Sequence, residues 1–203
     1  DRQTGKTVWK TDRTAEWNDL DADGKPTREG DLRKAYTTPL VADTGASGLQ
    51  LLSPGAKAAF AYDPRTGKEL WKVTYPSYSA AARPLYSKGL ALLISGSGKT
   101  ELLAIRPDGR GDVTATHIAW RRSQGVPRTP SPIVAGDLFF MTSEDGAVTC
   151  LETATGNEVW RERIGGNYAA SPILADGRIY FCSQQGKTTV IEAGRTFKAV
   201  ATN

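Results

Sequence analysis

The apolar residues of this chain fall into short runs separated by turns that are rich in glycine, serine and proline. The clearest apolar runs are 90–94, 138–141 and 179–182. Polar turns of nearly one form follow them at 95–98, 143–146 and 183–186. Short apolar runs between tight turns predict β-strands in hairpins, and no segment shows a convincing 3.6-residue period of a helix. The chain is therefore predicted to be all-β.

Two sequence phrases repeat along the chain and indicate its architecture. The phrase Asp63–Trp71 returns at Glu152–Trp160, the chain opens on it at Asp1–Trp9, and a stretched copy runs from Ala104 to Trp120. The second phrase has a proline that opens each unit, at Thr38-Pro39, Arg83-Pro84, Ser131-Pro132 and Ser171-Pro172. The spacing leaves room for units of roughly 45 residues, which is the usual size of a propeller blade.

Each unit contains four short strands, so the pattern predicts a β-propeller of four-stranded antiparallel blades, with about four blades present. The predicted blades are 36–75, 79–121, 128–164 and 168–203. Residues 1–14 are expected to add the outer strand of a preceding blade around Val8-Trp9-Lys10, and residues 15–35 to form a polar loop between blades. The repeated tryptophan is well placed to fill the space between neighbouring blades.

The spacing Ala61-x-Asp63-x-x-Thr66-Gly67-x-x-x-Trp71 resembles the tryptophan-docking motif of quinoprotein-type propellers. That superfamily includes pyrroloquinoline-quinone (PQQ) alcohol dehydrogenases and an outer-membrane assembly lipoprotein. The copy at 150–160 departs from the motif at Cys150 and Glu152, and the last unit is interpreted as having Phe197 in place of the tryptophan. The resemblance implies structural docking roles for Trp9, Trp71, Trp120, Trp160, Gly5, Gly67 and Gly156. It also implies an exported or periplasmic bacterial protein.

Propellers of this superfamily usually have seven or eight blades, so this chain resembles roughly half a ring that starts inside a blade. An open half ring is expected to expose two large apolar blade faces, which proteins rarely leave bare. Either further chain or another copy would have to cover them, and a homodimer of half-propellers is one arrangement that does so.

Composition and charge exclude several classes of function. The net charge of +4 comes from basic residues scattered among nearly as many acids, so no nucleic-acid site is expected. No apolar run approaches the length of a membrane span, and no signal peptide is visible. Cys150 and Cys182 lie in apolar runs and are interpreted as buried residues, although the sequence leaves a disulfide between them open.

The segment Asp19-Leu20-Asp21-Ala22-Asp23-Gly24 matches the front of a calcium-binding loop. Asp19, Asp21 and Asp23 are the expected ligands if a metal binds there. Position twelve of the loop, however, is Gly30, flanked by Glu29 and Asp31, where a bidentate glutamate is required. A calcium site and a solvated acidic turn both remain open.

A propeller presents ligands at the funnel along its axis and at the loops of its two ends, so candidate binding residues are sought where the inner strands begin. These candidates are Arg83, Arg128, Tyr78, Tyr168 and Trp17. An arginine before a strand-opening proline can hold a carboxylate or phosphate, or can be an ordinary surface residue. Trp17 either pins the loop around it or anchors a partner.

The sequence therefore predicts a non-catalytic propeller platform that binds a partner protein or a small ligand at the funnel end. The alternative is a portion of a PQQ-dependent alcohol or sugar dehydrogenase. The adjacent cysteine pair that the resemblance implies for such enzymes is missing, and no catalytic residue can be nominated. PQQ is accordingly not an expected cofactor, because a repeat match reports a fold and not a site.

Overall fold

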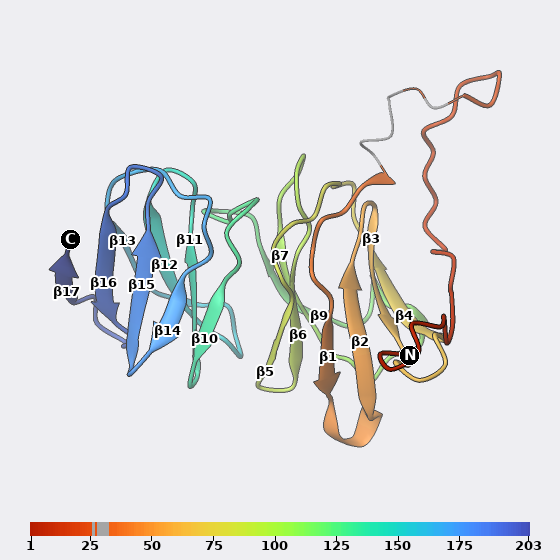
Figure 1. Cartoon of the computed structure of the whole chain (residues 1–203), viewed down its shortest axis with the longest axis horizontal. Coiled ribbons are helices and arrows are strands. Elements are labelled where there is room, and N and C mark those ends of the chain that lie inside the picture. Colours follow the sequence, from red (N-terminus) through yellow and green to blue (C-terminus); the bar gives the residue numbers. More distant parts are fainter. Residues whose placement is uncertain (26, 28–32) are drawn as a thin grey trace.

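The computed structural model describes residues 1–25, 27 and 33–203, and in these residues the chain forms four sheets, three with four strands and one with a fifth, short strand (Figure 1). The sheets stand side by side in sequence order, and we call them the first to fourth blades. The strands within each blade are antiparallel. This confirms the predicted all-β propeller fold with about four blades.

The first blade contains β1 (Leu40–Asp43), β2 (Leu49–Pro54), β3 (Ala58–Tyr62) and β4 (Glu69–Thr74), with a short 3-10 helix η2 (Gly45–Ser47). The second contains β5 (Leu85–Ser87), β6 (Leu90–Ile94), β7 (Leu102–Ile105) and β9 (Ile118–Arg122). The third contains β10 (Ile133–Ala135), β11 (Leu138–Thr142), β12 (Ala147–Glu152) and β13 (Glu158–Arg163). The fourth contains β14 (Ile173–Ala175), β15 (Arg178–Cys182), β16 (Thr188–Glu192) and β17 (Ala199–Thr202).

The serine that begins each polar hairpin turn also forms a hydrogen bond with the backbone near the start of the next strand. The Ser143 hydroxyl accepts a hydrogen bond from the Ala147 amide at 3.0 Å, and the Ser183 hydroxyl accepts one from the Lys187 amide at 3.1 Å. A serine hydroxyl that accepts a hydrogen bond from a nearby backbone amide stabilises a turn, because that amide is then not available for the hydrogen bonds of a helix or sheet. The repeated serine therefore fixes where the third strand of a blade begins.

Apolar clusters between neighbouring blades form the core. In β6, Ala91 and Leu93 pack toward the first blade, whereas Leu90, Leu92 and Ile94 pack toward the third. Both faces of such a strand are buried, and this explains why its sequence is continuously apolar and does not alternate. The core is thus a stack of interfaces, as expected for a repeat protein.

The indole N–H groups connect each blade to the next one along the chain. Three of them donate to backbone carbonyls in the following blade, and the pairs are Trp9 with Pro64 at 3.0 Å, Trp120 with Thr153 at 3.2 Å and Trp160 with Gly194 at 3.0 Å. A Cβ atom at Gly67 or Gly156 would lie only 2.5 or 2.6 Å from the indole of Trp9 or Trp120. Glycine at these turns is therefore required by the close approach of the ring.

Trp71 makes the same connection through a relay. Its indole donates to the Gln50 side-chain oxygen at 2.8 Å, and the Gln50 amide donates to the Pro107 carbonyl of the second blade at 2.8 Å. Both side chains are fully buried, so the relay satisfies polar groups that would otherwise be costly to bury.

Val8-Trp9-Lys10 belongs to no strand among the described residues, and its role as the outer strand of a preceding blade stays a prediction. Another detail of the predicted strands is wrong. Phe197 does not replace the tryptophan, because the register places Ala201 opposite Val190, in the position that Trp160 occupies opposite Cys150. Phe197 lies in the preceding turn and packs edge-on against the Trp160 ring, with 5.3 Å between ring centroids.

The outer faces of the end blades are not bare apolar surfaces. On the first blade, residues 9–19 cover the free face, and Phe60 beneath them is fully buried. On the fourth blade, the alignment of the repeats puts Arg178, Tyr180 and Thr188 where the third blade has Leu138, Phe140 and Val148. One of the two expected apolar faces is therefore covered. The other is mixed, because the register also places Ile173, Val190 and Ala201 on the face of Tyr180.

A short strand β8 (Gly111–Asp112) was not expected. It pairs in parallel with Trp71 and Lys72 of β4, so the stretched turn of the second blade adds a fifth strand to the first. The Thr114 hydroxyl then accepts a hydrogen bond from the Thr74 amide at 2.9 Å. Within the described part of the chain, no helix is long and apolar enough to cross a membrane.

Candidate functional site

The inner ends of all four blades surround a cavity of about 450 Å³. Its lining comes from the residues that flank the strand-opening prolines and from the strands that follow them. The lining residues are Thr38, Arg83, Leu85, Ser131, Pro132, Ile133, Val134, Ser171, Pro172 and Leu174. We call this the inner-strand cavity. The repeated motif with the strand-opening proline thus contributes residues to this cavity from every blade.

Hydroxyl groups of the repeated phrase join the inner strands around the cavity. The Arg83 amide donates to the Ser131 hydroxyl at 3.0 Å, and the Ser131 amide donates to the Ser171 hydroxyl at 3.0 Å. Between the first and second blades the phrase carries arginine, and the Thr37 hydroxyl donates to the Ala82 carbonyl at 2.8 Å instead. The second blade therefore presents a cation where the third and fourth present hydroxyls.

Arg83 alone is charged among the described residues that line the inner-strand cavity. Within the same part of the chain, its guanidinium forms no ion pair and donates no hydrogen bond. Leu85, Ile133 and Leu174 provide an apolar wall beside it, and Leu174 is 39% exposed. A guanidinium in a mostly apolar hollow suits an anionic group that is carried on an apolar segment.

The other predicted binding residues have different surroundings. Glu144 holds the segment around Arg128, since its Oε1 accepts hydrogen bonds from the Arg128 and Thr129 amides at 2.7 and 3.1 Å. Tyr78 is half-buried and bridges to Ser97. Tyr168 is 1% exposed in the core between the third and fourth blades. The prediction that Tyr168 contacts a partner is therefore wrong, because its ring serves as packing.

Trp17 lies under the guanidinium of Arg33, which is centred 5.5 Å from its ring. Arg33 also donates two hydrogen bonds to the carboxylate of Asp19, at 2.9 and 2.8 Å. Asp19 is 2% exposed. Its hydrogen bonds with Arg33 hold the pKa of Asp19 below its ordinary value. The arrangement joins the two ends of the 17–33 segment.

This pairing bears on the calcium hypothesis. Asp19 already has a cationic partner, and Asp21 Oδ1 accepts hydrogen bonds from the Asp23 and Lys25 amides at 3.0 and 2.8 Å. The residues that the structure describes contain no cluster of three or more acidic, histidine or cysteine side chains that could hold a metal. The remaining positions of the expected loop, Glu29, Gly30 and Asp31, lie outside the described residues.

Replacing Asp19 with asparagine is expected to release Trp17 at neutral pH. The lowered pKa means that the ion pair stabilises the segment above the ordinary value of 3.8 and is lost as the pH falls through the folded-state pKa. The variant should therefore show a red-shifted Trp17 emission and faster acrylamide quenching at pH 7, with a Trp17→Phe chain supplying the background. Unchanged quenching in Asp19→Asn would contradict the assignment.

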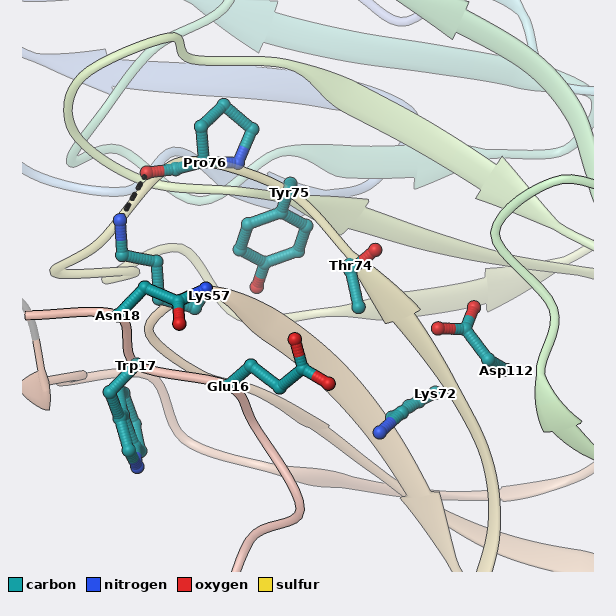
Figure 2. A pocket seen from close by; sticks show the side chains of 9 residues that line it. All are labelled: Glu16, Trp17, Asn18, Lys57, Lys72, Thr74, Tyr75, Pro76 and Asp112. Carbon is teal, nitrogen blue, oxygen red and sulfur yellow. Dashed lines mark hydrogen bonds between the residues drawn. The ribbon is translucent and has the colours of Figure 1, made fainter.

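A second cavity, of about 530 Å³, lies between the N-terminal segment and the outer edge of the first blade (Figure 2). It was not predicted from the sequence. Glu16 and Trp17 line one side of it, and Lys57, Lys72 and Asp112 the other. Lys72 donates to the Thr14 carbonyl at 2.9 Å. The lining thus mixes charges of both signs and does not select for one class of ligand.

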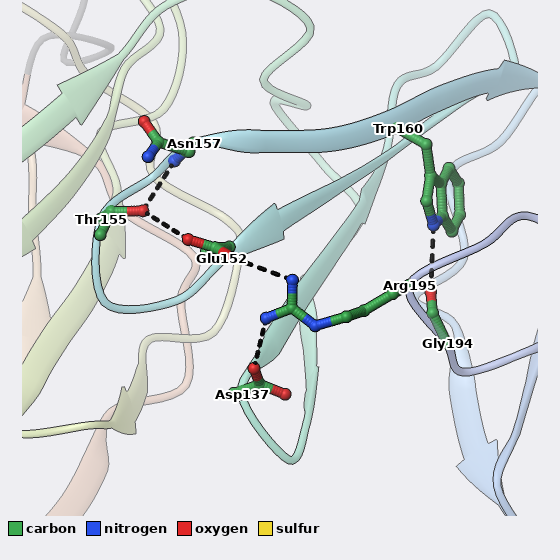
Figure 3. A network of polar contacts seen from close by, with 7 residues as sticks. All are labelled: Asp137, Glu152, Thr155, Asn157, Trp160, Gly194 and Arg195. Atoms are coloured by element: carbon green, nitrogen blue, oxygen red, sulfur yellow. Dashed lines mark hydrogen bonds and ion pairs between the residues drawn. The ribbon is translucent and has the colours of Figure 1, made fainter.

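A polar network at the boundary of the third and fourth blades has a structural role (Figure 3). Arg195 reaches from the fourth blade to Asp137 at 2.7 Å and to Glu152 at 3.0 Å. Its hydrogen bond lowers the pKa of Asp137. The network lies next to the contact of Trp160 with Gly194 and reinforces the same interface.

The described cysteines and three of the tryptophans have structural surroundings. Cys150 is buried in the third blade and Cys182 is exposed in the fourth, and both are free thiols. The indoles of Trp71, Trp120 and Trp160 are all hydrogen-bonded at blade interfaces. These groups therefore take part in blade packing, and no adjacent cysteine pair is present in the sequence.

Comparison with known proteins agrees with this architecture. The family model described as outer membrane protein assembly factor BamB matches residues 1–196. Among solved structures, BamB from Moraxella catarrhalis has a TM-score of 0.62 at 21% identity, and the match covers 82% of this chain and 52% of that chain. The search of curated proteins returned no match.

Two other solved structures share the fold. Quinohemoprotein alcohol dehydrogenase ADHIIG from Pseudomonas putida HK5 has a TM-score of 0.59 at 17% identity, covering 84% of this chain and 34% of that chain. The computationally designed Ika8 protein has a TM-score of 0.62 at 15% identity, covering 81% and 48%. This chain thus spans about half the length of BamB and of the designed protein, and about a third of the dehydrogenase. At these identities the likeness concerns the fold.

Proposed function

Because this chain belongs to the family described as outer membrane protein assembly factor BamB, we propose that it is a non-catalytic propeller platform that binds a partner protein. The partner contributes an acidic side chain, carried on an apolar segment, to the inner-strand cavity. In this proposal the chain works in the bacterial periplasm or in another exported location. The family's outer-membrane description supports that location.

The unpaired guanidinium of Arg83 carries the proposal. Seven of the thirteen other described arginines have acidic partners, such as Arg163 with Asp145 at 2.6 Å and Arg195 with Asp137. Arg83 has none among the described residues and faces an apolar wall. Arg83 is exposed, and hydrogen bonds to charged groups contribute about 1.5–3 kcal/mol each. An acidic group on an apolar segment satisfies both features of the cavity.

Selection of peptides tests this proposal. A random peptide library panned on the folded chain is expected to yield acidic sequences with neighbouring apolar residues. Their affinity should fall at least tenfold for Arg83→Glu, because a like charge then meets the peptide carboxylate. Arg178→Glu is the matched control, since Arg178 is an exposed arginine on β15 that does not line the cavity, and it should leave the affinity unchanged.

Two results would contradict the proposal. The first is a set of peptides that bind wild type and Arg83→Glu equally. The second is a chromophore and dye-linked alcohol oxidation on addition of PQQ with calcium, which would favour the dehydrogenase alternative. The wild-type chain is expected to show neither chromophore nor oxidation.

A further inference from the structure

A third cavity, of about 460 Å³, lies where the first blade meets the long turn of the second blade. Its lining comes from the turn after β1, from the start of β2, from the turn between β3 and β4, and from that long turn. Leu49, Asp63, Arg65, Leu70 and Arg110 belong to it. We call this the two-arginine cavity. Among the described residues, it shares no lining residue with the inner-strand cavity.

The pairing of β8 fixes the backbone next to Arg110. Gly111, the following residue, pairs with Trp71 of β4. Two residues further on, the Val113 amide donates to the Lys72 carbonyl at 2.9 Å. The long turn of the second blade is therefore held against the first blade at this point, and Arg110 is placed beside the turn that contains Arg65.

The two guanidinium groups have no acidic partner among the described residues. That of Arg65 forms no hydrogen bond or ion pair there, and that of Arg110 donates only to the Gly109 carbonyl, at 2.7 Å. The one acidic residue in the described lining is Asp63, whose Oδ1 accepts hydrogen bonds from the Arg65 and Thr66 amides at 2.8 and 3.1 Å. The bond from the Arg65 amide is the main cause of the lowered pKa of Asp63, so this carboxylate stays charged at neutral pH.

The boundary of the third and fourth blades shows the same place with its anions supplied by the chain (Figure 3). There Arg195 binds the carboxylates of Asp137 and Glu152. Glu152 has the position in the repeated phrase that Asp63 has in the first blade. Arg110, like Arg195, follows a glycine in the turn after the third strand of the next blade. The two boundaries can therefore be compared residue by residue.

Two replacements reverse the charge at the first of these boundaries. The strand register puts Leu49 where the third blade has Asp137. The repeated phrase puts Arg65 where the third blade has Ala154. One acid is thereby lost and one cation gained, so a network of one arginine with two carboxylates becomes a cavity with two arginines and one carboxylate. The anion that Asp137 supplies at the other boundary has no counterpart in the described lining of the two-arginine cavity.

We propose that the two-arginine cavity binds a small aliphatic dicarboxylate. Each guanidinium pairs with one carboxylate, because the planar fork of arginine matches the two oxygens of such a group. One carboxylate takes the place that Asp137 fills at the other boundary. Leu49, which is 44% exposed, and Leu70 provide apolar contacts for the methylene groups between the carboxylates.

Titration calorimetry of the full chain with glutarate at low ionic strength tests the inference. Pentanoate is the control ligand, because it has the same carbon chain with one carboxylate fewer. Glutarate is expected to bind at least tenfold more tightly than pentanoate. Arg65→Gln and Arg110→Gln should each weaken glutarate at least fivefold, since each removes one charged partner. Arg178→Gln is the matched control, since Arg178 is an exposed arginine on β15 outside the cavity, and it should leave the affinity unchanged.

Substitution of Leu49 supplies the missing acid from the chain itself. Leu49→Asp is expected to lower the affinity for glutarate at least tenfold with the melting temperature retained, because its carboxylate occupies the place of the ligand. Leu49→Asn has nearly the same size without the charge and should retain the affinity within threefold. Arg83→Glu should also retain it, so the result does not depend on the proposed function of the inner-strand cavity.

Four outcomes would overturn the inference. Absence of glutarate binding, or equal affinity for glutarate and pentanoate, would remove the dicarboxylate. Unchanged affinity in both Arg65→Gln and Arg110→Gln, or equal loss with Leu49→Asp and Leu49→Asn, would remove the cavity as its site. Far-UV circular dichroism of each variant controls for folding.

Discussion

Trp71→Ala is expected to lower the free energy of unfolding by about 3–5 kcal/mol, the range for truncating a buried large aromatic residue. Trp71 is fully buried between the first and second blades, among Ala61, Leu93 and Ile105. The substitution leaves a cavity at that interface. It also removes the indole N–H that the buried Gln50 side chain accepts, so a polar group loses its partner as well.

Urea denaturation followed by circular dichroism measures this effect. Trp71→Phe is the control, because it keeps a six-membered aromatic ring and loses the five-membered ring with its N–H donor, and its expected cost is about 1–3 kcal/mol. If Trp71→Ala cost less than about 1 kcal/mol, the first and second blades would not be packed through this residue.

Gly96→Ala is expected to destabilise the chain by about 1–3 kcal/mol more than Gly98→Ala, the range for overpacking. The two glycines lie in the same hairpin turn of the second blade with φ of 94° and 92°, so the strain of a positive φ is nearly the same in both variants. They differ in their surroundings. A Cβ at Gly96 would lie 2.6 Å from the Ala80 amide nitrogen and closer still to the Tyr78 carbonyl, whereas one at Gly98 would lie 3.5 Å from the Tyr78 ring.

The comparison isolates the backbone contact, because alanine adds one methyl group at either position. Thermal unfolding of both variants under one set of conditions gives the difference directly. Equal destabilisation would show that segment 78–80 can move away from the turn. The bridge of Tyr78 to Ser97 would then be loose and not a fixed part of the blade.

Much of the fold was predictable, since the repeated phrases mark both ends of each blade. Strands buried on both faces appear as continuous apolar runs, and these are conspicuous in β6 and β11. By contrast, β8 has two residues, Gly111 and Asp112, and no apolar signal. It forms because the long turn of the second blade reaches β4 of the first blade. A pairing between two distant segments produces no hydrophobic periodicity in either of them, so it could not be predicted from the sequence.

The last blade shows how a repeat can mislead. Phe197 was chosen because an aromatic residue is expected near the degenerate turn, but the register depends on the ladder between β16 and β17. The turn before β17 is one residue longer than in the third blade, since Ile191 pairs with Ala199, eight positions on, whereas Leu151 pairs with Glu158, seven positions on. The longer turn places Ala201 opposite Val190, while the bulge beside this position recurs in every blade and does not account for the difference.

The candidate site was predicted in part. Arg83 was identified because it precedes a strand-opening proline, and the same phrase in the other blades turned out to line one cavity. The pairing of Asp19 with Arg33 was not foreseen, because Asp19 begins a calcium-like motif and Arg33 lies beyond its end. Tyr168 occupies a loop position in the sequence, yet its ring is drawn into the core between two blades.

The most direct test of the proposed function is a map of backbone amide NMR shifts on adding the acidic peptide selected on the wild-type chain. We predict the largest shifts at residues 38, 83–85, 131–134 and 171–174, and their loss in Arg83→Glu. Shifts confined to residues 8–20 or to the outer strands would contradict the assignment of the inner-strand cavity as the binding site.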